Sequence, residues 1–149
     1  MRRETALVLL LALAMGAAEV KETALERLQL TTDRLVAMGE EMVGEPVSGI
    51  LRPGDTLEVA MAMDTAYSYH IHVWTNSIFN LVEFWVRDPA GRVAGMAEGD
   101  HTTLSLYPDT SGEYHLLMKL HEADEADSAG YAAALFHRPR MSSATPEED

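Results

Sequence analysis

Apolar and polar side chains alternate with a period of two residues over most of the chain between Val47 and His137. This period is typical of β-strands that have one buried and one exposed face. Short segments rich in Gly, Pro, Asp, Asn and Ser separate the alternating runs, as tight turns do. About eight strands are predicted: Val47–Leu51, Thr56–Met63, Tyr67–Thr75, Asn80–Val86, Arg92–Ala97, Thr102–Leu106, Glu113–His121 and Tyr131–His137. Because no helix-length crossover separates them, the pattern predicts an antiparallel β-sandwich.

Two of the separating segments have the composition of specific turns. Arg52-Pro53-Gly54-Asp55 places Pro and Gly at the two central positions of a type II turn. In Asp88-Pro89-Ala90-Gly91, Asp suits the first turn position and Pro fixes φ at the second. Gly91 then tolerates the left-handed geometry that starts a return strand.

An amphipathic helix is predicted before the strands, from Glu19 to Val43. Its apolar stripe recurs at three- and four-residue steps: Leu25, Leu28, Leu35, Met38 and Met42. Charged residues lie mostly off this stripe: Glu22, Glu26, Arg27, Arg34, Glu40 and Glu41. Gly39 costs about 1 kcal/mol relative to Ala inside a helix, and Pro46 ends the segment. We expect the helix to pack against the sandwich; the alternative is that it pairs with a partner.

The first residues have the features of a secretory signal peptide. Met1-Arg2-Arg3 is basic, Ala6–Met15 is an apolar run of ten residues, and small residues follow up to Ala18. The run is too short for an ordinary transmembrane helix. The expected organisation is a signal peptide over 1–18, helix and linker over 19–45, sandwich over 46–137 and a disordered tail over 138–149. The expected location is periplasmic or secreted.

Composition narrows the function classes. A formal net charge of −13 disfavours binding to nucleic acid and to anionic membrane surfaces. The chain has no cysteine, hence no cysteine nucleophile, and it contains no Gly-x-Ser-x-Gly motif. We therefore expect a chain that binds rather than catalyses.

Several short motifs occur in the same order as in a known family. They are Pro53-Gly54-Asp55, Glu83-Phe84-Trp85-Val86 followed by Asp88-Pro89 and Gly91, then Ser111-Gly112-Glu113-Tyr114, and Tyr131, Ala133 and Leu135. In this the chain resembles bacterial pre-peptidase C-terminal domains over about residues 47–137. The resemblance implies a secreted, jelly-roll-like β-sandwich that serves as a non-catalytic binding or accessory module.

Histidines suggest a metal site. His70 and His72 share one face of a predicted strand, about 7 Å apart at their Cα atoms, a spacing that allows a shared metal. Three residues of other strands have the same outward parity: Glu83, His115 and His121. Zinc or copper would suit such a set, and the alternative is a group of surface histidines. A possible calcium loop is acidic but lacks the usual ligand spacing: Glu122, Asp124, Glu125 and Asp127.

Large apolar residues are predicted on the side of the strands opposite the core: Trp74, Leu81, Trp85, Leu117 and Phe136. This surface is too large to leave in water without a reason. Either the N-terminal helix covers it, or Trp74, Trp85 and Phe136 form a platform for a glycan or a partner protein.

The sequence therefore predicts an exported binding or accessory module that engages a protein or polysaccharide through an exposed sheet face. The alternative function is a periplasmic metal-binding protein that uses the His70-x-His72 strand site.

Overall fold

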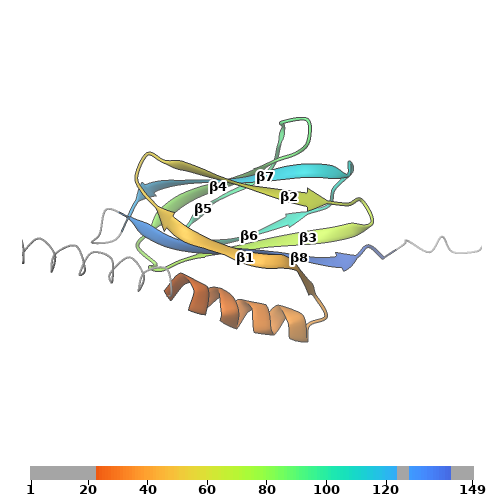
Figure 1. The fold of residues 1–149 in the computed structure, drawn as a ribbon, viewed down its shortest axis with the longest axis horizontal. Helices are drawn as coiled ribbons and strands as arrows, with labels where there is room; N and C mark the ends of the chain where they lie inside the picture. The colour runs from red at the N-terminus through yellow and green to blue at the C-terminus, as the bar shows by residue number, and fades with distance from the viewer. Residues whose placement is uncertain (1–22, 124–127, 142–149) are drawn as a thin grey trace, which may run out of the picture.

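The computed structural model describes residues 23–123 and 128–141, and within these residues eight strands form two four-stranded antiparallel sheets (Figure 1). The strands are β1 (Glu41–Leu51), β2 (Thr56–Met63), β3 (Tyr67–Thr75), β4 (Leu81–Arg87), β5 (Val93–Gly99), β6 (His101–Leu106), β7 (Gly112–Glu122) and β8 (Ala129–Pro139). The sheet orders are β1-β8-β3-β6 and β2-β7-β4-β5, the arrangement of a jelly roll. The predicted antiparallel jelly-roll-like sandwich, preceded by a helix, is confirmed.

The core lies between the two sheets and is built from the alternating residues of both. Val82, Phe84 and Val86 of β4 are fully buried, as predicted. They face Ile71, Val73 and other apolar side chains of the opposite sheet within one hydrophobic cluster. Burying each side chain of this size contributes about 1.5–3 kcal/mol before the entropy cost is counted. This energy fixes the register of each strand, because a slip by one residue would expose all of its buried side chains.

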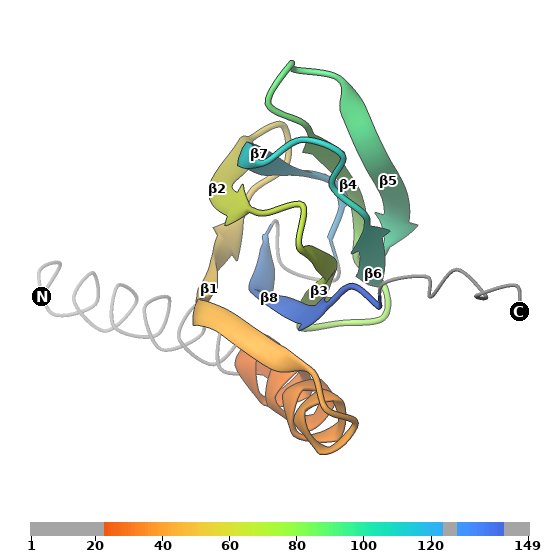
Figure 2. The ribbon, with the colours of Figure 1, turned by 90° about the vertical axis from the view of Figure 1, so that its right-hand side faces the viewer.

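The edge strands of the two sheets meet along two sides of the sandwich, β5 and β6 on one side and β1 and β2 on the other (Figure 2). The edge strands β5 and β6 are joined by a tight reversal at Gly99 and Asp100 and lie next to each other. The other two edge strands, β1 and β2, belong to different sheets and are not hydrogen-bonded neighbours. A cavity between β1 and β2 reaches the core, since residues of both strands and the core residues Ile71 and Leu116 line it.

Both predicted turns are confirmed. The N–H of Asp55 donates to the carbonyl of Arg52 at 3.1 Å, and Gly54 has a φ of 85°. In the turn between β4 and β5, the N–H of Gly91 donates to the Asp88 carbonyl at 2.9 Å and φ of Gly91 is 81°. These positive φ angles explain why glycine occupies both positions.

The helix ends earlier than predicted. Residues 23–37 are helical, and the chain then turns through Gly39, which has a φ of 89°. The N–H of Glu40 donates to the Leu35 carbonyl and that of Gly39 to the Val36 carbonyl, both at 3.0 Å. This is a Schellman motif with glycine at the left-handed position, so Gly39 terminates the helix instead of lying inside it.

The first strand is correspondingly longer than predicted. It begins at Glu41 instead of Val47, and Met42 and Val43 pair with Phe136 and Leu135 of β8. A register shift between Val43 and Val47 accommodates Pro46, which an edge strand tolerates at a bulge. At the other end of the chain β8 extends to Pro139. The predicted signal peptide and most of the acidic loop lie outside the described residues.

Candidate functional site

The outer face of the β2-β7-β4-β5 sheet carries an apolar row across its strands. Leu117 of β7 pairs with Glu58 of β2 on one side and with Trp85 of β4 on the other, and Trp85 pairs with Met96 of β5. Leu117 is buried, Trp85 is partly buried and Met96 is 65% exposed. We call this surface the open face, because among the described residues no helix or strand packs over it (Figure 2).

Polar side chains flank the row on both sides. One neighbouring row contains Lys119 and Glu83, and the carboxylate of Glu83 lies 2.8 Å from the ring of His121. The other contains Arg87 and His115, which pair across the strands. These groups of mixed charge can donate and accept hydrogen bonds around the indole, and their exposure means that their ion pairs add little to stability.

The outer face of the β1-β8-β3-β6 sheet, here called the covered face, is different because the helix packs on it (Figures 1 and 2). Ala24 and Leu28 of the helix form one buried cluster with Phe136 and two alanines of β8, and Trp74 packs against this cluster. Phe136 is fully buried. Helix coverage therefore accounts for Trp74 and Phe136, and of the three predicted platform residues only Trp85 lies on the uncovered face.

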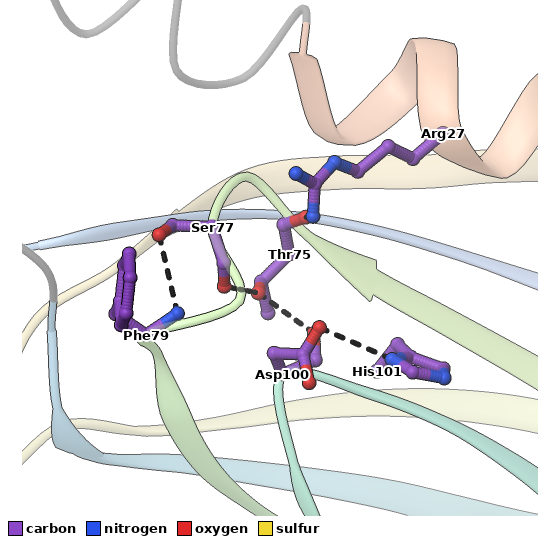
Figure 3. A network of polar contacts seen from close by, with 6 residues as sticks. All are labelled: Arg27, Thr75, Ser77, Phe79, Asp100 and His101. Atoms are coloured by element: carbon purple, nitrogen blue, oxygen red, sulfur yellow. Dashed lines mark hydrogen bonds and ion pairs between the residues drawn. The ribbon is translucent and has the colours of Figure 1, made fainter.

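A polar network fixes the end of β3 beneath the helix (Figure 3). The Arg27 guanidinium donates to the Thr75 carbonyl at 3.3 Å, and the Thr75 hydroxyl lies 2.7 Å from the Asp100 carbonyl oxygen. The His101 ring contacts the Asp100 carboxylate at 3.1 Å and stacks on Trp74 with ring centroids 4.3 Å apart. Trp74 is thus held by the helix and by the stacked imidazole of His101, so its ring has a structural role.

The predicted metal set is divided between the two outer faces. His70 and His72 of β3 lie on the covered face, whereas Glu83, His115 and His121 lie on the open face. The core separates the two groups, so they cannot share an ion. Within the described residues no group of three or more His, Asp or Glu side chains is already arranged to hold a metal.

The structure places a different residue, Glu40, beside the His70-x-His72 pair. Its Oε1 lies 2.5 Å from Nδ1 of His70, and the His70 and His72 ring centroids are 6.2 Å apart. Glu40 is 7% exposed although its sequence position predicted a solvent-facing helix residue. In the sequence, Gly39 was the one feature that could have predicted this burial, because a helix that ends at Gly39 turns the chain back toward β3.

His72 is the most deeply buried histidine of this group, at 7% exposure. Desolvation lowers the pKa of His72 below its ordinary value; the Glu40 carboxylate opposes this effect and the neighbouring His70 adds to it. Its Nδ1 lies 3.0 Å from the Thr103 hydroxyl, and its ring packs edge-on against Phe136. A neutral imidazole is therefore held in one orientation.

A cavity of about 230 Å³ opens between β1 and β2, beside the register shift between Val43 and Val47. Most of its lining is apolar, including Val43, Val59, Met61 and Leu116. The cavity gives access to the core between β1 and β2 and offers few polar groups to orient a ligand.

No family model matches the chain, and no curated protein matches it. The resemblance to pre-peptidase C-terminal domains therefore stays a prediction. Two solved structures with some similarity are the arabinose-bound α-L-arabinofuranosidase MgGH51 (12% identity, TM-score 0.35) and a family two carbohydrate esterase from Cellvibrio japonicus (11% identity, TM-score 0.38). The matches cover 66% and 69% of this chain and only 23% and 33% of those chains. Similarity at this level carries no information on ligand or activity.

Proposed function

We propose that the chain is an exported, non-catalytic binding module that engages a glycan or protein partner through the open face. The observation that supports this most is the difference between the two outer faces. The helix covers one of them, whereas the other presents Trp85 between Leu117 and Met96 with no described helix or strand above it. A contiguous apolar row on an exposed sheet face is typical of an interaction surface, whereas single scattered apolar residues are not.

The chemistry of the open face suits a sugar ring best. A flat indole stacks against the apolar face of a pyranose, while side chains beside it bond to the hydroxyl groups. Glu83, Arg87 and Lys119 lie in the rows next to Trp85 and supply both donors and acceptors. The net charge of −13 argues for a neutral or cationic glycan over an acidic one.

Export rests on the predicted signal peptide at 1–18. Among the described residues, no helix has the length and apolar character to cross a bilayer. Mass spectrometry of the chain recovered from its natural host would test this part of the proposal. We expect a mature N-terminus at Glu19, and an intact Met1 in the cytoplasm would contradict it.

Binding at the open face is tested with the full processed chain and a panel of insoluble polysaccharides, with soluble oligosaccharides for titration by tryptophan fluorescence. Trp85→Ala removes the stacking surface and should weaken binding by roughly 2- to 13-fold or more, since one aromatic stacking contact contributes about 0.5–1.5 kcal/mol beyond its buried area. Phe79→Ala is the matched control, because Phe79 is 70% exposed but lies in the loop between β3 and β4.

The panel separates the two partner classes. Binding to a polysaccharide that is lost in Trp85→Ala and kept in Phe79→Ala supports a glycan partner. Failure to bind any glycan, together with a Trp85-dependent interaction with an exported protein, supports a protein partner. Binding that is equally strong in Trp85→Ala contradicts the assignment of the open face.

A further inference from the structure

A buried carboxylate lies at the junction of the helix and β1, on the covered face. The Glu40 side chain is 5% exposed and contacts His70 through Oε1. Among the described residues its other oxygen, Oε2, has no hydrogen-bond partner, and no Lys or Arg pairs with it. Glu40 also lies three residues past the last helical residue, and the negative end of the helix dipole disfavours a carboxylate there. A positive partner would relieve both costs.

A buried imidazole nitrogen nearby is also unsatisfied. Nε2 of His72 has no hydrogen-bond partner among the described residues, whereas Nδ1 lies 3.0 Å from the hydroxyl of Thr103. When Nδ1 donates to that hydroxyl, Nε2 is left with a free lone pair. Histidines that bind metals are commonly oriented in this way, by a hydrogen bond from the other ring nitrogen.

The spacing of the two histidines fits a shared ion. Their ring centroids are 6.2 Å apart and their planes differ by 61°. With zinc–nitrogen bonds of about 2.0–2.1 Å and tetrahedral angles, two imidazoles on one zinc ion have ring centroids about 5.2 Å apart. Rotation of the two side chains would therefore have to bring the rings about 1 Å closer together to reach one ion.

We propose that Glu40, His70 and His72 form a binding site for a divalent transition-metal ion of the zinc type at the junction of the helix and β3. This site is independent of the open face, because it lies on the other side of the core. Two imidazoles and one carboxylate suit zinc, whereas calcium and magnesium prefer ligand sets made of oxygen.

The three side chains are not gathered around one point, and Glu40 contacts His70 directly. Binding exchanges this contact for bonds from both residues to the ion, with His72 as the third ligand and water completing the shell. The ion would link the end of the helix to β3, so metal should stabilise the docked helix.

The test uses the full processed chain, freed of metal with a chelator and titrated with zinc chloride at neutral pH by calorimetry. We expect saturable binding of one zinc per chain and a rise in melting temperature with zinc concentration. Glu40→Gln and His72→Ala should each weaken binding by roughly tenfold or more. Thr103→Val keeps all three ligands and should weaken binding by about tenfold through loss of the hydrogen bond that orients His72.

Asp100→Asn and His101→Ala are matched controls, because they alter a histidine–carboxylate pair at the other end of the same sheet. Both should bind zinc as the unchanged chain does. X-ray absorption of the one-to-one complex should show two imidazole ligands, which keeps the proposal testable if Glu40→Gln folds poorly. No saturable binding, or equal losses in the controls and in His72→Ala, would overturn the site.

Discussion

Replacing Leu28 by alanine tests whether the helix is an integral part of the domain. Leu28 is 1% exposed and packs against Phe136 and small residues of β8. Leu28→Ala removes three buried carbon atoms, which at about 0.8 kcal/mol each amounts to roughly 2.4 kcal/mol of lost burial. A cavity that relaxes only in part adds to this loss, and because the helix rests on one sheet face it can move toward the sheet. We therefore expect about 3 kcal/mol, within the usual range for such changes.

The measurement is urea unfolding followed by tryptophan emission and far-ultraviolet circular dichroism. A loss of this size should lower the melting temperature by on the order of 10 °C. Leu30→Ala is the matched control, because Leu30 is on the same helix and 73% exposed, so its change should stay within about 0.5 kcal/mol. Equal unfolding free energies for the two variants would refute the docked helix and, with it, the division into a covered and an open face.

Three further outcomes follow from particular contacts. Because burial lowers the pKa of His72 in the folded chain, His72 of the unfolded chain binds a proton before that of the folded chain does as the pH falls below about 6.5. The unfolding free energy should thus drop between neutral and mildly acidic pH, and less in His72→Gln; equal slopes would contradict this. Gly49→Ala places a Cβ 2.9 Å from the ring of Tyr131 and should lower the unfolding free energy by about 1–3 kcal/mol in denaturant unfolding. Gly95→Ala meets only ordinary contacts at 3.6 Å and should lower it less. A smaller loss for Gly49→Ala than for Gly95→Ala would contradict the close packing at Gly49. Asp88→Ala removes an acceptor of two turn N–H groups, both at 2.9 Å, and should cost about 1 kcal/mol, most of which Asp88→Asn should restore; equal losses in both variants would argue against the turn bonds.

The strands were predictable because a strand with one buried and one solvent-exposed face alternates apolar and polar side chains with a period of two residues. Thr56–Met63 and Tyr67–Thr75 were predicted with the bounds of β2 and β3. Both carry clean alternation between strong turn signals, so local sequence was enough. The ends of β1 and of the helix were predicted wrongly because Met38 and Met42 continue the helical spacing past Gly39. Only the pairing of Met42 with Phe136, which is distant in sequence, decides for a strand.

The candidate sites were harder to predict for a different reason. Alternation tells which side chains point out of a sandwich, but not which of its two outer faces they reach. His72 and His115 have the same parity, yet they lie on opposite sides of the molecule because β3 and β7 belong to different sheets. The same ambiguity grouped Trp74 with Trp85. Glu40 was missed since its burial depends on the turn at Gly39 and on the docked helix.

The position of β8 sets the order in which the molecule can be built. The last strand of the chain lies between the first and the third, so the β1-β8-β3-β6 sheet is incomplete until the C-terminal strand has been synthesised. Contacts between such distant segments close long loops and make folding slow. A nascent chain would therefore leave this sheet unformed until the residues of β8 have been added to it.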